Sequence, residues 1–171
     1  AGAISIFTKQ PNLDAFEAYV ESSVGDYDLG RLTAAASGPL SETVAYRLTG
    51  NVHREDGYME NSAGSDLNGA DDWYVIGKLL YEPSDTLAIL LTGSHVDRDT
   101  NCCGADAVQS ESVNAELAAR GLPVDKNDPY DYEIATDIDG EFKVRTDSLS
   151  LVADQELAAG ALKSITAWGE S

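Results

Sequence analysis

The clearest pattern in the chain is an alternation of apolar and polar side chains over residues 43–53. The even-numbered positions are Val44, Tyr46, Leu48, Gly50 and Val52, and the odd-numbered ones are Thr43, Ala45, Arg47, Thr49, Asn51 and His53. Because successive side chains of a strand point to opposite faces, this stretch predicts a β-strand with one apolar and one polar face. Its length suits a tilted strand that crosses a bilayer, which needs about 9–11 residues, although a half-buried strand of a soluble sandwich alternates in the same way.

Alternation in other stretches, and an apolar run over residues 87–96 that is apolar on both faces until Thr92, contribute to the prediction of six further strands. The seven predicted strands cover residues 16–24, 30–37, 43–53, 73–81, 87–96, 142–152 and 161–168. In the fourth of these, Trp73 and Tyr81 lie at the two ends of an apolar face, which is typical of the aromatic girdles at the two bilayer interfaces. A shorter, β-branched strand is expected over residues 3–9. No apolar run reaches about 18 residues, so no transmembrane helix is expected.

The predicted connections differ in length in a regular way. They cover residues 25–29, 38–42, 54–72, 82–86, 97–141 and 154–160. In an up-and-down meander, alternate connections lie at the same end of the sheet, so the long third and fifth connections share one end and tight turns occupy the other. Outer-membrane barrels have this asymmetry, whereas a soluble sandwich has no reason to have it. The two long connections contain six and twelve acidic residues.

Within the longest connection, a short helix is expected. Ser110 is a residue type that caps the amino end of a helix, and Gly121 is suited to end it. Val113 and Leu117 would then face inward.

Charge and cysteine content narrow the possible functions. The 171 residues include 30 acidic and 11 basic side chains, a net charge of −19, which argues against nucleic-acid partners and against anionic membrane surfaces. The two cysteines, Cys102 and Cys103, are adjacent, so a disulfide framework is excluded. They would form a vicinal disulfide, or one would pair with a cysteine outside this chain, and an oxidised structural role is favoured over reactivity.

Candidate sites for chemistry are weak. Two histidines without a matching carboxylate spacing make a poor metal site, so no metal is expected, and residues 137–140 (Asp-Ile-Asp-Gly) lack the remaining ligands of a calcium loop. Asp71, Asp72 and the acids of residues 125–133 are interpreted as solvated loop charge, with weak calcium binding as the less favoured alternative. Nucleophile elbows, phosphate-binding loops and zinc-protease motifs are missing, so neither an enzyme nor a cofactor is expected.

Several short motifs carry a family resemblance when they are taken in order. They are Gly-Ala-Ile-Ser-Ile-Phe-Thr-Lys at 2–9 followed by Pro11, Val-Gly-Asp-Tyr-Asp at 24–28, Ser-Gly-Pro-Leu-Ser at 37–41, Ala-Tyr-Arg-Leu at 45–48, Arg-Glu-Asp-Gly-Tyr at 54–58, Asp-Asp-Trp at 71–73, Leu-Tyr-Glu-Pro-Ser-Asp at 80–85, and Asp-Arg-Asp at 97–99 with the cysteine pair. In this order they resemble part of a TonB-dependent outer-membrane receptor, from the last strand of its plug into the first strands of its barrel.

The resemblance implies an all-β fold, an antiparallel up-and-down transmembrane β-barrel. Residues 1–11 would be the end of the plug domain, and residues 12–171 would be about seven barrel strands. Such receptors close roughly 22 strands around the plug, so the chain is expected to be a fragment that lacks the TonB box, most of the plug and the remaining barrel.

The function implied by the resemblance is TonB-dependent active uptake of a scarce ligand across the outer membrane of a Gram-negative bacterium. A ferric siderophore is expected first, then cobalamin, haem or an oligosaccharide. The implied partners are the TonB energy-coupling complex, outer-membrane lipid and the ligand. The two rivals are a passive porin, against which the strand over residues 3–9 argues, and a soluble β-sandwich that binds glycans or calcium.

The resemblance also implies where a ligand would be bound. The loops at 54–72 and 97–141 would form part of the outer binding surface. The residues expected to line the lumen against the plug are Arg47, Asn51, Lys78, Lys143 and Arg145. Among these, Arg47, Asn51 and Lys78, together with His53 and His95 near the loop-side strand ends, are the candidate ligand contacts, although a solvated or interface role is favoured for the two histidines.

Overall fold

The computed structural model describes residues 2, 8–104, 110–124, 128, 130–136 and 140–171. In these residues the elements are β1 (Glu17–Val24), β2 (Gly30–Ser41), β3 (Val44–Glu55), β4 (Glu60–Asn61), β5 (Ala70–Ser84), β6 (Leu87–Asn101), α1 (Glu111–Ala119), β7 (Glu133–Ile134), β8 (Glu141–Leu157) and β9 (Gly160–Glu170). The predicted all-β fold with seven long strands is confirmed. The strand expected over residues 3–9 lies largely outside the described residues.

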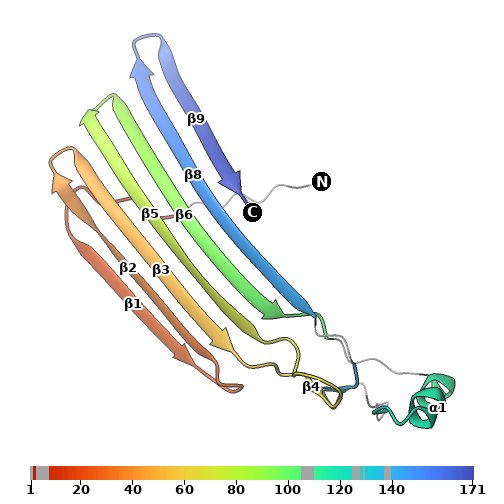
Figure 1. The fold of residues 1–171 in the computed structure, drawn as a ribbon. Helices are drawn as coiled ribbons and strands as arrows, with labels where there is room; N and C mark the ends of the chain where they lie inside the picture. The colour runs from red at the N-terminus through yellow and green to blue at the C-terminus, as the bar shows by residue number, and fades with distance from the viewer. Residues whose placement is uncertain (1, 3–7, 105–109, 125–127, 129, 137–139) are drawn as a thin grey trace.

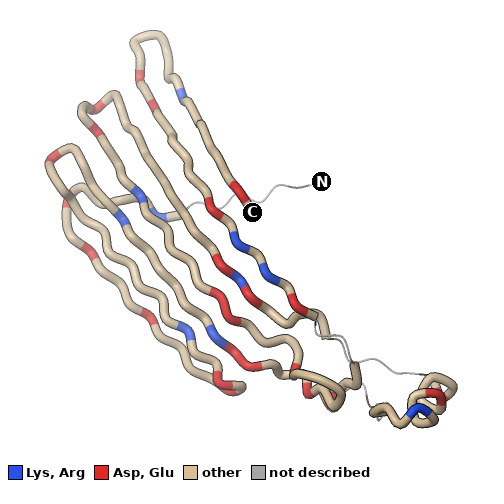
Figure 2. The backbone as a smooth tube through the Cα atoms, in the orientation of Figure 1, with Lys and Arg blue, Asp and Glu red and all other residues tan. Residues whose placement is uncertain are grey.

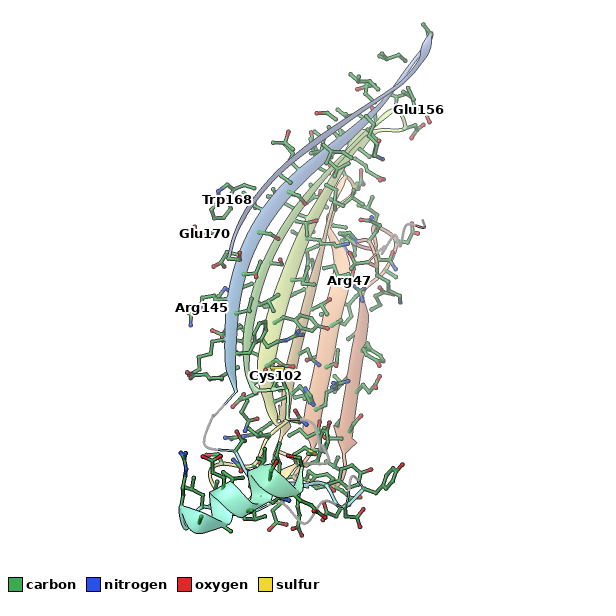
Figure 3. The ribbon with its side chains drawn as sticks, turned by 90° about the vertical axis from the view of Figure 1, so that its right-hand side faces the viewer. Arg47, Cys102, Arg145, Glu156, Trp168 and Glu170 are labelled. Carbon is green, nitrogen blue, oxygen red and sulfur yellow. A yellow bond between two sulfur atoms is a disulfide. The ribbon has the colours of Figure 1, made fainter. Side chains whose placement is uncertain are left out.

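The long strands form one antiparallel sheet in the order β1-β2-β3-β5-β6-β8-β9. Each long strand therefore pairs with the next long strand along the chain, and the predicted up-and-down meander is confirmed (Figure 1). The sheet is curved along its length (Figure 3) and open between β1 and β9, as expected for a segment of a barrel wall. The short strands β4 and β7 pair with each other in parallel, outside this sheet.

The three short connections are shorter than the sequence predicts. Two prolines that were expected to end their strands lie within them instead. Pro39 and Pro83 were expected in connections, but β2 continues to Ser41 and β5 to Ser84. Each proline lies where the strand register shifts, and a bulge of this kind tolerates a residue without a backbone N–H. β8 likewise runs to Leu157, so the connections at this end shrink to residues 42–43, 85–86 and 158–159.

The predicted asymmetry of the two ends is confirmed. The short turns lie together at one end of the sheet, and the connections at 25–29, 56–69 and 102–140 lie at the other, which we call the loop end (Figure 1). Figure 2 shows charged residues gathered near the two ends, with the stretch between them largely uncharged. No helix among the described residues is long and apolar enough to cross a membrane.

The helix predicted in the longest connection is present, but its orientation differs from the prediction. The Ser110 hydroxyl accepts a hydrogen bond from the Val113 amide at 3.4 Å, and Gly121 follows the helix with a φ of 70°. However, Val113 is 46% exposed, and the helix contains no buried residue. The expected inward face is wrong because α1 packs against none of the described strands.

The pleat of the sheet gives it two distinct faces. Ser37, Arg47 and Lys78 stand opposite one another in register and share what we call the inner face, against which residues 8–12 lie. The other side is the outer face. Its exposed apolar side chains, which we call the apolar band, are Val20, Leu32, Leu48, Val52, Trp73, Leu79, Tyr81, Leu91, Leu149, Leu151, Leu157, Leu162 and Trp168. An exposed apolar surface of this extent is suited to lipid rather than to water.

The apolar band runs diagonally across the strands. On β3 the apolar residues of the outer face run from the half-buried Val44 to Val52, with Leu48 at their middle, and on β8 the band extends from Leu149 to Leu157. Leu48 aligns through β5 and β6 with Leu149, so the middle of the band on β3 aligns with its loop-side end on β8. Strands of transmembrane barrels tilt by roughly 35–45°, so a layer of constant depth crosses neighbouring strands at such a diagonal.

Arginine at two neighbouring positions of β3 tests the assignment of the faces. Leu48 is 53% exposed in the middle of the apolar band, so Leu48→Arg should destabilise the folded protein in lipid vesicles by about 2–4 kcal/mol. Thr49→Arg places the same charge on the polar inner face and should destabilise it much less. The free energy of unfolding in urea measures both. Equal losses, or a larger loss for Thr49→Arg, would mean that the faces are misassigned.

Candidate functional site on the inner face

The N-terminal segment, residues 8–12, is attached to the inner face by buried polar side chains. The ammonium of Lys78 donates hydrogen bonds to the carbonyl oxygens of Thr8 at 3.1 Å and Lys9 at 2.8 Å. The Ser37 hydroxyl accepts one from the Asn12 amide at 2.9 Å and donates one to the carbonyl of Tyr46 at 2.9 Å. Lys78 is only 7% exposed and Ser37 is fully buried. Because unpaired polar groups are costly to bury, these bonds hold the segment against the strands.

Arg47 lies beside Lys78 in the register of β3 and β5. Its guanidinium Nη1 lies 2.8 Å from Oε1 of Glu17 on β1, so a carboxylate of the same face balances the arginine charge. A cavity of about 230 Å³ adjoins this pair; its lining residues are Thr8, Lys9, Arg47, Thr49, Tyr74, Ile76 and Lys78. Arg47 and Lys78 therefore lie on the inner face, where the sequence placed them, and Lys78 binds the N-terminal segment.

A second polar cluster occupies the loop end of the inner face. Nδ1 of His53 lies 3.1 Å from Oδ2 of Asp72, and Nε2 lies 3.5 Å from Oε2 of Glu55. Arg98 approaches the other oxygen of Asp72 at 3.7 Å. One row closer to the short turns, the Asn51 amide donates to the Thr33 hydroxyl at 2.8 Å. The cluster offers both signs of charge and several hydrogen-bond partners, which suits recognition of a polar ligand.

Three of the expected site residues lie on the outer face instead. Nδ1 of His95 is 2.7 Å from Oδ1 of Asp147, and its ring lies 4.8 Å from that of Trp73. Arg145 pairs with Asp97 at 2.8 Å, and Lys143 pairs with Asp99 at 3.2 Å. The expectation that Lys143 and Arg145 line the lumen is wrong, and His95 does not join His53. In Figure 3, Arg145 and Trp168 lie to one side of the curved sheet and Arg47 to the other.

The physical reason is that β8 extends beyond the apolar band. Ser148 and Ser94 meet on the inner face with their hydroxyl oxygens 2.7 Å apart, so the odd-numbered residues of β8 face outward. On the loop side of Leu149, the outer face of β8 lies beyond the apolar band, and its side chains there are charged. The hydrogen bonds of Lys143 to Glu141 and Asp99 raise the pKa of this lysine, which lies outside the band and stays protonated.

Three asparagines that the sequence did not single out connect the long loops. The amide of Asn61 donates to the carbonyl of Thr136 at 3.0 Å, and that of Asn68 donates to the carbonyl of Gly104 at 2.9 Å. Asn101 accepts a hydrogen bond from the Gly69 amide at 2.7 Å. Their partners lie up to 75 residues away, so only Asn68, at a positive φ of 66° before a glycine, carries a local sequence signal.

The cysteines and the acidic motif give no further site. Cys102 and Cys103 are joined to each other, which is one of the two pairings expected. Across the parts of the chain that the structure describes, no three histidine, cysteine or acidic side chains are grouped so as to hold a metal ion. Residues 137–139 of the calcium-like motif lie outside those parts.

Comparisons with known proteins give a match to a solved structure. No protein-family model matches the chain, and no curated protein matches its sequence. A solved structure of the complex between FpvAI and pyocin S2 has a similar fold, with a TM-score of 0.69 and 16% sequence identity. The match covers 94% of this chain and 20% of that chain, so the chain spans about one fifth of the length of the solved protein. At this level of identity the likeness shows the β fold alone.

Removing the Lys78 ammonium tests whether it holds the N-terminal segment. With Lys78→Met the carbonyls of Thr8 and Lys9 lose their donor, so a spin label at the exposed position Gln10 should become more mobile by electron paramagnetic resonance. Lys163→Met is the matched control, because this exposed lysine of the inner face pairs with Asp154. An unchanged spectrum for Lys78→Met, or an equal change for the control, contradicts the assignment.

Proposed function

We propose that this chain is part of an outer-membrane receptor that takes up a scarce ligand by TonB-dependent transport. The observation that carries the proposal is the attachment of residues 8–12 to the inner face through Lys78 and Ser37. A receptor of this class needs a segment inside the barrel that joins the plug to the wall. A passive porin needs no such element, and a soluble sandwich would cover this face with a second sheet.

The outer face supports the membrane part of the proposal. Its apolar band is exposed, crosses the strands at the diagonal expected for tilted strands, and gives way to charge pairs on the loop side of β6 and β8. Outer-membrane lipid is therefore the proposed environment of the band, with the long loops on the outside of the cell. This places the acidic loop end where a ligand would first arrive.

The loop end of the inner face is the proposed wall of the ligand site. Asn51, His53 and Asp72 face inward there, and Arg98 adds a positive charge. The family resemblance favours a ferric siderophore as the ligand, and the clustered donors and charges would bind its polar groups. The protein performs no bond-breaking step in this proposal, and no cofactor takes part.

The attachment of residues 8–12 also suggests which part of a plug moves. Hydrogen bonds to charged groups contribute roughly 1.5–3 kcal/mol each, and Lys78 makes two of them to consecutive carbonyls. The segment would therefore stay with the barrel wall while TonB acts on residues that precede it. The barrel end of the plug would serve as a fixed anchor for the motion.

Uptake measurements test the proposal in the full-length protein that carries this chain. Cells that express it should accumulate iron from at least one of a panel of radio-iron-loaded siderophores, and deleting TonB should abolish the accumulation. The protein should also remain in the outer-membrane fraction until detergent is added. Uptake that persists without TonB would favour a porin, and extraction into buffer alone would contradict a membrane location.

A further inference from the structure

Three tyrosines form a connected row at the loop end. Tyr58 lies in edge contact with Tyr27 on one side and Tyr132 on the other, and both pairs of ring centroids are 6.3 Å apart. The three side chains belong to three different connections of the sheet, yet all are exposed, at 53%, 40% and 58% for Tyr27, Tyr58 and Tyr132. We call them the tyrosine row. Aromatic rings in contact normally pack inward, so an exposed row is available to a partner.

The backbone holds the tyrosine row in place. The amide of Asp56 donates to the carbonyl of Tyr27 at 2.8 Å, and the amide of Glu60 donates to the carbonyl of Tyr132 at 2.9 Å. Tyr27 and Tyr132 both have a φ of 58°, which bulky residues rarely adopt. Such backbone conformations persist where the surrounding structure enforces them, and they often mark functional sites. The rings are thus positioned before any partner binds.

The stretches of chain that carry the tyrosine row are acidic. Residues 25–29, 56–69 and 128–136, which carry its three rings, contain eight acidic residues and neither lysine nor arginine, and the nearest basic residues in the adjoining strands are Arg31 and Arg54. Among these acids, Asp26, Asp28, Asp56 and Glu60 are exposed. A surface of this kind attracts cations, and ring faces bind guanidinium groups well because these are planar and weakly hydrated.

We propose that the tyrosine row docks an extended, arginine-bearing segment of a partner polypeptide. An extended chain rises about 3.3 Å per residue, so side chains at alternate positions recur at about 6.6 Å, close to the ring spacing of 6.3 Å. Arginines at alternate positions would then meet successive rings. A small cation could contact only one or two of the three rings, so an extended peptide matches the whole row better. The inference depends on the proposed function only in placing this end outside the cell.

The test uses the full-length protein that carries this chain, in detergent micelles. Its probe is a fluorescein-labelled peptide with the sequence Arg-Gly-Arg-Gly-Arg, and binding is measured by fluorescence anisotropy. The peptide should bind more tightly than the corresponding glutamate peptide and should resist competition by free arginine at the same concentration of positive charge. Binding should weaken as salt increases, because the exposed carboxylates are screened.

Variants separate the contribution of the rings from that of charge alone. Tyr58→Ala should weaken binding roughly two- to fivefold, and Tyr58→Phe, which keeps the ring, should bind as the wild type does. The matched control is Tyr130→Ala, since Tyr130 is 86% exposed in the same connection as Tyr132 but lies outside the row, and it should have no effect. Asp56→Asn leaves all rings in place and should weaken binding at low salt only.

Three results would overturn the inference. They are equal affinity for the arginine and glutamate peptides, full competition by free arginine, and an equal loss in Tyr130→Ala and Tyr58→Ala. Binding is measured in micelles without transport, so none of these results bears on TonB-dependent uptake, which the uptake experiment tests separately. Loss of uptake with intact peptide binding would likewise affect the proposed function alone.

Discussion

Hydrogen bonding between neighbouring strands is the constraint on which the rest of this structure depends. β6 and β8, for example, pair without interruption from Leu87 to Asn101. In hydrocarbon no water can replace a lost backbone partner, so every strand must pair along its length before its side chains can face lipid. The same constraint leaves β1 and β9 with open edges in this sheet, which is therefore one part of a closed wall rather than a complete one.

The two faces of the sheet follow from that pairing and are stabilised in different ways. The described residues contain few buried apolar side chains, namely Ala35, Ala45, Met59 and Leu67. The outer face exposes its apolar side chains instead of burying them in a core, and the inner face is ordered by polar contacts of Ser37, Arg47 and Lys78. The sheet is therefore the reverse of a soluble domain, because its apolar side chains are exposed on the outer face and its buried charges lie on the inner face.

Much of the fold could be predicted from the sequence. Apolar and polar side chains alternate with a period of two along a strand, and successive strands of a meander run in opposite directions. The seven strands, their order and the unequal ends follow from that pattern. The ends of β2 and β5 could not be predicted, since Pro39 and Pro83 lie in bulges that only pairing reveals. The inner-face positions of Arg47 and Lys78 followed from parity, but the carbonyls that bind Lys78 are about 70 residues away. Lys143 was wrongly predicted on the inner face, because a polar side chain indicates the inner face only in the part of a strand that lies within the apolar band.

The central claim is that the outer face lies in lipid while the inner face lies in water, and spin labels along β8 in the vesicle-embedded protein test it most directly. Labels at Leu149 and Leu151 should collide with dissolved oxygen more than with a water-soluble nickel chelate, and labels at Ser148 and Ser150 should do the reverse. A label at Arg145, beyond the apolar band, should meet the chelate. Equal access of the chelate to odd and even positions from 148 to 151 would contradict the membrane assignment of the sheet.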